Sequence, residues 1–538
     1  MTLGVTLALA LAPFLNLAAR QSRPAGPRFE ISFAASARPE PVTGRVYVAI
    51  GRLDERRTPI QQAGATGAPL FGMGVENLAP GEHASIGADV FGHPVQSLAD
   101  LAPGEYLAQP FVNVYTRFAR ADGHTVWLHM DQWEGQNWKT SPGNLYGDPV
   151  RVRIDPSGAP PIRLAADKVI PPIEVPADTE YVRRIKIRSE ILSRWWGHPI
   201  DIGATVLVPR GFDQHPDVKY PVVYSQGHFS LAAPGGFGRD QAFTNWWQAD
   251  GTPRMLYVTL QHPSPYYDDS YGVNSANNGP FGDAILKELV PAVEAKFRAI
   301  GQPWARMLTG GSTGGWIALA HQVFYPDFYG GTFALCPDSV DFRYHQIVNV
   351  YEDANAYWLD RGWTKVERPN QRRPDGNIQS MMKDENWYEL AVGDASRSGG
   401  QWDIWEATYS PVGPDGYPKR IWDKRTGAID KSVAEYWKTH YDLRHALESN
   451  WSVLGPKVAH KINVYIGDMD SYYLNMGVRM LDEFLRQRAK DPPFAGEIVF
   501  QPMAPHCWGP RGPELLRKIV AHVDRYAPRG TDLESWKY

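Results

Sequence analysis

The sequence predicts an α/β fold: a doubly wound, mostly parallel sheet with an N-terminal β-sandwich domain and a large aromatic-rich insertion. Three observations carry this prediction. Short strand-like runs fill residues 28–165, strands and helices alternate from residue 180 to residue 530, and that alternation breaks down at about 338–456. The chain has 538 residues, more than one compact core accommodates, because cores stop growing at roughly 250–300 residues.

Residues 1–19 form an apolar run that ends in small residues before Arg20, which is typical of the core of a signal peptide. No lysine or arginine precedes the run, so the usual positive start is missing. The run is too short and too interrupted for a membrane span, and no later segment approaches the ~18 consecutive apolar residues that a span needs. We therefore expect a secreted or periplasmic protein with no membrane span after removal of the signal peptide.

The region 28–165 reads as all-β. Short runs with alternating polarity are separated by glycine, proline and aspartate turns, a spacing that suggests a β-sandwich. The predicted strands are 29–33, 44–50, 106–118, 125–129 and 150–154. No catalytic constellation occurs here, so we expect a packing role rather than substrate binding. The following segment, 166–179, contains three prolines between Ile170 and Pro176 and is predicted to be a stiff linker.

From residue 180 the chain alternates between strands and helices. Two runs, 182–189 and 200–208, are predicted as a leading hairpin. Residues 284–298 have apolar positions close to helical spacing and predict an amphipathic helix. Further strands are predicted at 220–224, 255–260, 307–309, 331–335, 461–466 and 497–500, and further helices at 316–324 and 513–526.

The predicted insertion, about 338–456, is too long to be structureless within a compact domain. It contains eight tryptophans. Trp402, Trp405 and Trp422 could line a substrate cleft at the catalytic edge of the sheet, or could form a small core of the insertion itself. We expect the core role for most of them and a substrate contact for at least one.

The strongest chemical signal is Gly310-Gly-Ser312-Thr-Gly314, which fits the pattern G-x-S-x-G. A serine on a sharp turn from strand to helix needs strained backbone angles and small neighbours. An apolar strand precedes this motif and a helical pattern follows it, so Ser312 is predicted to be a nucleophile. The beginning of that helix would favour negative charge beside the serine.

A serine hydroxyl needs a base that takes its proton. In a fold that presents its nucleophile in this way, the acid and then the histidine follow the serine along the chain. His506 is the histidine that lies in a loop after the last predicted strand, so it is the predicted base. Asp468 and Asp470 follow the preceding strand. We choose Asp470 as the acid because the acid usually lies a few residues beyond its strand, and Asp468 remains the alternative.

The oxyanion of an acyl-transfer reaction needs two backbone N–H donors. Thr313, directly after the nucleophile, is predicted to supply one. The other is expected from the loop that follows the strand 220–224, where Gly227 would allow close approach. The amides of His228 and Phe229 are both candidates.

These motifs resemble the putative-esterase (esterase D-like, enterochelin esterase-like) group of the α/β-hydrolase superfamily, which also includes S-formylglutathione hydrolases, feruloyl esterases and mycolyltransferases. The similarity covers roughly 180–337 and 456–530, and includes the Glu-Leu-Val-Pro run at 288–291. It implies an α/β-hydrolase fold, ester hydrolysis, and Ser312, His506 and Asp470 as catalytic residues. The group often has His-Gly in the oxyanion loop, whereas this chain has Gln226-Gly-His. The β-region and the insertion are not part of the group's minimal form.

Composition excludes several other functions. The formal net charge is −4 and no long basic block occurs, so nucleic-acid binding has no electrostatic footprint. No P-loop, H-E-x-x-H, dinucleotide fingerprint or zinc-like grouping is present, and we predict no cofactor and no metal. Asp268 with Asp269, or Asp338 with Asp341, could bind a cation such as calcium, but solvation in loops explains them more simply.

The predicted function is therefore a serine carboxylic-ester hydrolase that acts through an acyl-enzyme intermediate on a small-molecule or carbohydrate ester. A peptidase or an acyltransferase could use the same triad, and a non-catalytic glycan-binding protein is a third possibility. The two cysteines, Cys336 and Cys507, could form one disulfide or remain two buried thiols. The sequence does not predict the oligomeric state.

Overall fold

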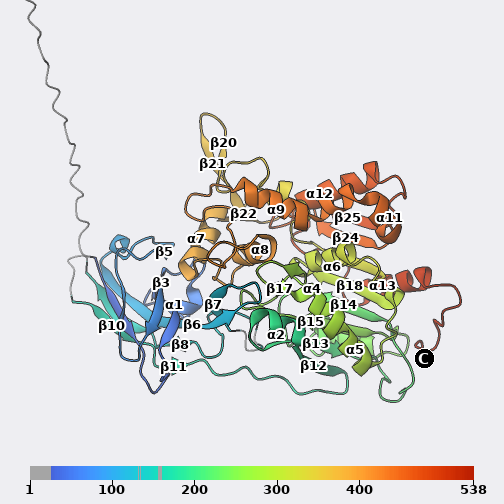
Figure 1. The fold of residues 1–538 in the computed structure, drawn as a ribbon, viewed down its shortest axis with the longest axis horizontal. Coiled ribbons are helices and arrows are strands. Elements are labelled where there is room, and N and C mark those ends of the chain that lie inside the picture. Colours follow the sequence, from blue (N-terminus) through green and yellow to red (C-terminus); the bar gives the residue numbers. More distant parts are fainter. Residues whose placement is uncertain (1–25, 131–132, 134, 156–159) are drawn as a thin grey trace, which may run out of the picture.

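The computed structural model describes residues 26–130, 133, 135–155 and 160–538. The predicted signal peptide lies outside these residues. The described chain forms an N-terminal pair of sheets, a second eight-stranded sheet flanked by helices, and an insertion above that sheet (Figure 1). No helix within the described ranges is long and apolar enough to cross a membrane.

The N-terminal region contains a three-stranded sheet in the order β10-β1-β4 and an eight-stranded sheet in which β11-β8-β6-β2-β3-β5 are neighbours and β7 and β9 both pair with β6. Alternate residues such as Ile31, Val46 and Val48 are buried in a shared apolar core. The segment predicted as a linker contributes β11 to the larger sheet, because its prolines begin only after that strand. The strands are β1 Phe29–Ser32, β2 Val42–Gly51, β3 Leu70–Leu78, β4 Ala84–Ile86, β5 Gly92–His93, β6 Gly104–Ala119, β7 Thr125–His129, β8 Leu145–Tyr146, β9 Val150–Ile154, β10 Ile162–Ala165 and β11 Lys168–Val169, with the short helix α1 Pro59–Gln62.

The second sheet has the order β12-β13-β15-β14-β18-β19-β24-β25. The first two strands pair antiparallel to each other and β13 pairs antiparallel to β15, whereas the six strands from β15 to β25 are parallel. This is the predicted α/β layer. The strands are β12 Val182–Ser189, β13 Ile200–Leu207, β14 Val222–Gln226, β15 Leu256–Gln261, β18 Arg306–Gly311, β19 Gly331–Leu335, β24 Ile462–Gly467 and β25 Glu497–Gln501.

The predicted leading hairpin is confirmed, because β12 and β13 pair antiparallel. The segment between them forms a helix, α2 (Glu190–Trp196), which Ser189 caps by accepting the amide of Leu192. One local feature differs from the sequence prediction. The predicted helix 284–298 is a helical stretch that begins at α4 (Phe281–Ala284) and contains a π-turn over Ile285–Leu289 before α5 (Val290–Phe297). Pro291 supplies no amide to the ladder, which explains the wider turn before it.

The remaining helices flank the sheet or close the chain. The helix α6 (Thr313–Phe324) packs against β14, β18 and β19. The others are α3 Gln241–Gln248, α12 Asn475–Glu483, which continues as a π-helix over Phe484–Arg488, and α13 Gly512–Tyr526; a two-stranded pair, β16 Asn274–Ser275 and β17 Gly279–Pro280, lies before α4.

The insertion lies between β19 and β24 and folds mostly into helices. Its core is aromatic: the ring of His345 lies 4.6 Å from Trp405 and 5.2 Å from Trp437, centroid to centroid, and Trp422 packs at 5.3 Å from Trp402. The elements are the hairpins β20 Trp358–Asp360 with β21 Lys365–Glu367 and β22 Pro369–Arg372 with β23 Ile378–Met381, and the helices α7 Met382–Val392, α8 Gln401–Tyr409, α9 Lys431–Tyr441, α10 Leu443–Ser449 and α11 Trp451–Val458.

The N-terminal sheet supports the insertion directly. Arg45 on β2 donates to the carbonyls of Leu390 and Ala391, and the hydroxyl of Tyr47 donates to the carbonyl of Val392 at 2.6 Å. These carbonyls belong to the last turn of α7, where a carbonyl oxygen has no N–H donor from a following helical turn. A cation at a helix C-terminus is also favourable for the helix dipole. The N-terminal region therefore fixes the end of α7.

Candidate active site

Ser312 lies at the turn between β18 and α6 with φ at 56° and ψ at −122°. A side chain at positive φ is strained, and such strain is concentrated at functional sites. The turn closes because its neighbours are glycines: a Cβ on Gly310 would lie 2.3 Å from the Gly314 carbonyl oxygen, and one on Gly314 would lie 2.0 Å from the Gln226 carbonyl oxygen. The predicted G-x-S-x-G motif thus holds Ser312 at the carboxyl edge of the sheet.

The structure brings Ser312, His506 and Asp470 together. The Nε2 atom of His506 lies 3.0 Å from the Ser312 hydroxyl, and its Nδ1 atom lies 2.7 Å from Oδ2 of Asp470. His506 follows β25 and Asp470 follows β24, so both loops leave the same edge of neighbouring parallel strands. The fully buried Asp470 also accepts the amides of Tyr472 and Leu474 on Oδ1. These two donors fix the orientation of the carboxyl group.

Asp468, the alternative acid, has a different partner. Its Oδ1 atom accepts the amide of Met503 at 3.0 Å. That contact joins the turn after β24 to the loop that carries His506. Asp468 therefore braces the loop, whereas Asp470 contacts the imidazole itself.

Cys336 and Cys507 form a disulfide bond, which resolves the alternatives that the sequence left open. Cys507 directly follows His506, and Cys336 directly follows β19. The amide of Ser312 lies 3.2 Å from the Cys336 sulfur. The bridge therefore ties the histidine loop to the strand beside the serine turn.

A carboxyl group other than that of Asp470 contacts the nucleophile directly. Oδ1 of Asp338 lies 3.2 Å from the Ser312 hydroxyl, and Oδ2 accepts the hydroxyls of Tyr271 at 2.5 Å and Thr313 at 3.2 Å and the amide of Gln401 at 3.4 Å. Burial raises the pKa of Asp338 above its usual range, although the Tyr271 hydrogen bond opposes this rise. Sequence reasoning considered Asp338 only as a cation ligand. The sequence feature that could have identified Asp338 as a site residue is its position just after β19, the strand that pairs with the serine strand β18.

The protonation of Asp338 decides where the serine proton can go. A protonated Asp338 donates to Ser312, which leaves the serine proton for His506; an ionised Asp338 competes with His506 for that proton. In Asp338→Asn the donors to Oδ2 hold the amide oxygen in place, so the amide N–H faces Ser312. We expect Asp338→Leu, which offers Ser312 no hydrogen-bonding group, to have a kcat about 10-fold below that of Asp338→Asn, the cost of one hydrogen bond.

The pH profile of kcat checks this assignment. As the pH rises through the raised pKa of Asp338, native turnover is expected to fall, and Asp338→Asn is expected to show no such fall. Superimposable native and asparagine profiles would contradict the competition between the two acceptors.

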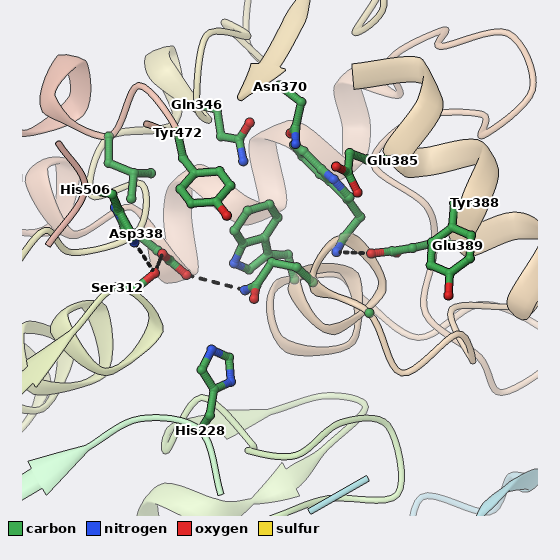
Figure 2. A pocket seen from close by; sticks show the side chains of 15 residues that line it. His228, Ser312, Asp338, Gln346, Asn370, Glu385, Tyr388, Glu389, Tyr472 and His506 are labelled. Carbon is green, nitrogen blue, oxygen red and sulfur yellow. Dashed lines mark hydrogen bonds between the residues drawn. The ribbon is translucent and has the colours of Figure 1, made fainter. Parts of the chain in front are cut away.

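The side chains of the three predicted oxyanion residues lie in different places. Thr313 begins α6, and its hydroxyl donates to Asp338. The ring of Phe229 packs at 5.4 Å from Trp133, so its side chain faces the N-terminal region. The ring of His228 lies across the cavity from Ser312 (Figure 2). Which amide of the Gln226–Phe229 loop donates to an oxyanion stays a prediction.

His228 carries a positive charge at neutral pH. Its Nδ1 atom lies 2.9 Å from Asp268 and 3.4 Å from Asp269. Burial lowers the pKa of His228, but the hydrogen bonds to both aspartates outweigh this effect and raise it to about 11. Both acidic pairs considered as cation sites thus have cationic partners in the chain, since Asp341 forms ion pairs with Arg343 and Arg444.

A cavity of about 540 Å³ opens at Ser312. Trp402 and Trp405 line it, as proposed from the sequence, but Trp422 does not. The indole of Trp422 donates to Asn386 at 3.0 Å and packs behind Trp402, so this residue belongs to the core of the insertion. The lining residues are His228, Ser312, Asp338, Gln346, Asn370, Glu385, Tyr388, Glu389, Gly400, Gln401, Trp402, Trp405, Tyr472, Leu474 and His506.

Comparison with solved structures gives matches of low sequence identity and low TM-score. A ferulic acid esterase is 15% identical, with 60% of this chain and 90% of that chain covered and a TM-score of 0.36. The S-formylglutathione hydrolase from Agrobacterium tumefaciens is 12% identical, with coverages of 65% and 97% and a TM-score of 0.34. A prolyl endopeptidase structure is 11% identical, with coverages of 86% and 62% and a TM-score of 0.35. Similarities at this level carry no information about the substrate.

Sequence comparison is more specific. No curated protein matches the chain. Residues 199–387, however, match the family described as putative esterase. This range includes the loop Gln226–Phe229, which is predicted to supply an oxyanion donor, the serine turn and the first part of the insertion. This segment is similar to the putative-esterase family, and the match supports an esterase activity.

Proposed function

We propose that this esterase cleaves carboxylic esters through a covalent acyl-enzyme, with Ser312 as nucleophile, His506 as general base and Asp470 as the acid that orients the histidine. The observation that carries this proposal is the continuous hydrogen-bond chain from Asp470 through His506 to Ser312. The backbone at Ser312 supports it, because the strained turn presents the hydroxyl at the mouth of a cavity.

Each residue has a defined step. His506 accepts the Ser312 proton as the oxygen attacks the ester carbonyl, and then donates that proton to the departing alcohol. Water attacks the acyl-serine by the same route in reverse and releases the acid. Asp470 keeps Nδ1 protonated, so that Nε2 faces Ser312 as an acceptor, and stabilises the imidazolium that forms. The Thr313 amide and one amide of the Gln226–Phe229 loop stabilise the oxyanion.

We further propose that the enzyme works outside the cytosol, in the periplasm or the medium. The Cys336–Cys507 disulfide supports this location, since disulfides persist in oxidising compartments.

Covalent labelling tests the mechanism. We expect a fluorophosphonate to label the native enzyme once, on the peptide that contains Ser312, and 4-nitrophenyl acetate to give a burst of one nitrophenolate per labelled site. Mass spectrometry of the digest locates the label. A label on another residue, or ester turnover that survives complete labelling of Ser312, would refute the proposed mechanism.

A further inference from the structure

A strand of the insertion lies against the loop that carries Asp470. The strand is β22, and the loop, residues 468–474, joins β24 to α12; we call it the acid loop. The backbone amide of Arg372, the last residue of β22, donates to the carbonyl of Ser471 at 2.9 Å. The insertion therefore supplies part of the hydrogen bonding that holds the acid loop.

The side chain of Arg372 spans the acid loop. Its Nε atom donates to the backbone carbonyl of Asp470 at 3.0 Å, and its Nη2 atom donates to Oδ1 of Asn475, the first residue of α12, at 3.2 Å. The amide of Asn475 in turn donates to the carbonyl of Asp468 at 2.9 Å. A guanidinium is planar and rigid, with donors in fixed directions. These bonds therefore fix the position of Asp470 relative to the start of α12.

The acid loop contains a strained residue that depends on outside support. Tyr473 has φ at 63°, a conformation that surrounding contacts must maintain in a residue other than glycine. The guanidinium of Arg372 lies over the ring of Tyr473, with its central carbon 4.3 Å from the ring centroid. Arg372 thus contacts both the backbone of Asp470 and the strained residue of the same turn.

The hydrogen bond between Asp470 and His506 depends on where the acid loop lies. Oδ2 of Asp470 is 2.7 Å from Nδ1 of His506. Oδ1 of the same carboxyl group accepts the amides of Tyr472 and Leu474, which belong to the acid loop itself. These two donors would move together with the carboxyl group if the loop shifted. Contacts from outside the loop, such as those of Arg372, are needed to keep the carboxyl group beside the imidazole.

The residue before Arg372 supports the histidine by a second route. The side-chain amide of Gln371 donates to the hydroxyl of Tyr472 at 3.2 Å. The ring of Tyr472 packs nearly perpendicular to the imidazole of His506, with the two centroids 4.9 Å apart. Two consecutive residues of β22 therefore support Asp470 and the ring that packs on its histidine.

We propose that Arg372 is a positioning residue for the triad, which holds the acid loop so that Asp470 keeps its hydrogen bond to His506. This inference rests on the proposed function, and it gives the insertion a part in the chemical step. Arg372 is not among the residues that line the cavity, so it acts through Asp470 and not through the substrate. Acylation is therefore expected to depend on Arg372, whereas binding of the ester is not.

The acylation step of Arg372→Met tests the proposal, because methionine keeps an apolar stem and removes the guanidinium. Stopped-flow measurement with 4-nitrophenyl acetate gives the acylation rate constant and the dissociation constant of the ester. We expect the rate constant to fall about 30-fold, between the cost of one charged hydrogen bond and that of a displaced catalytic group. The dissociation constant is expected to stay within about twofold of the native value. An unchanged rate constant, or a loss confined to binding, would overturn the proposal.

A double-mutant cycle separates positioning from a general loss of structure. If Arg372 acts through Asp470, its removal has little effect once Asp470 no longer orients the histidine. Arg372→Met is therefore expected to change the acylation rate constant less than about twofold in an Asp470→Asn background. A loss of about 30-fold in both backgrounds would mean that the two residues act independently, and would reject the positioning role.

Arg298→Met is the matched control. Arg298 donates from Nε to the carbonyl of Val218 at 3.4 Å and from Nη2 to the carbonyl of Phe212 at 2.6 Å, and it lies 3.7 Å above the Phe212 ring. It makes the same kinds of contact as Arg372, but at the end of α5. We expect the two methionine variants to lose similar amounts of melting temperature, and Arg298→Met to acylate within about twofold of the native rate. Equal losses of acylation in both variants would reject a specific role for Arg372.

The same measurements distinguish failure of this inference from failure of the proposed function. Native acylation in Asp470→Asn would reject the proposed triad, whatever Arg372→Met does. A large loss in Asp470→Asn together with native acylation in Arg372→Met would reject the positioning role alone.

Discussion

Replacement of Ser312 by alanine is expected to lower kcat for 4-nitrophenyl acetate at least about 10⁴-fold while the fold survives. The hydroxyl of Ser312 lies 3.0 Å from Nε2 of His506, so its removal leaves the base without a nucleophile to activate. Turnover that remains is expected to reflect oxyanion stabilisation and substrate binding. Steady-state kinetics and thermal unfolding check both parts of the expectation.

Ser410→Ala is the matched control for Ser312→Ala. Ser410 is buried, and its hydroxyl accepts the indole N–H of Trp437 at 2.9 Å, away from the lining of the cavity. This change is expected to lower stability by about 1 kcal/mol and to leave kcat unchanged. Native-like turnover by Ser312→Ala, or an equal loss in both variants, would contradict the nucleophile assignment.

Asp470→Asn is expected to lower kcat about 10⁴-fold, the size of effect that follows when a triad histidine adopts the wrong tautomer. An asparagine amide that donates to Nδ1 of His506 places the imidazole proton on Nε2. The Nε2 atom then cannot accept the proton of Ser312. Stopped-flow measurement of acylation, with substrate binding measured separately, locates the loss in the chemical step.

Asp468→Asn supplies the comparison from the same turn. Its side-chain oxygen can still accept the amide of Met503, and the distant contact with Arg479, at 3.9 Å, is a surface pair of little value. We expect kcat within about threefold of the native value. A larger loss in Asp468→Asn than in Asp470→Asn would reverse the roles of the two aspartates.

The parts of this structure that the sequence predicts are those with local causes. Glycines around Ser312 reveal a tight turn because a Cβ would collide with backbone, and His506 stands out because it follows the last strand. The α/β sheet is predicted because alternation of strands and helices restricts topology. Chain order also places Asp470 after the penultimate strand, at the same edge as the serine.

The unpredicted parts depend on contacts between distant segments. Asp338 joins the site through hydrogen bonds with Tyr271, Thr313 and Gln401, which lie on three other segments of the chain. Trp402 and Trp422 have the same residue type and similar sequence surroundings, yet one faces the cavity and the other lies behind it. Composition alone does not separate these roles, because packing within the insertion decides them.

The anchoring of α7 on β2 has a consequence for the cavity. Glu385, Tyr388 and Glu389 form one wall of the cavity, and the last turn of their helix is held by Arg45 and Tyr47. A mutation on that distant strand can therefore tilt the wall without touching any bound molecule. Transfer of residues 180–530 alone onto another protein would remove the contacts of Arg45 and Tyr47 that hold this wall.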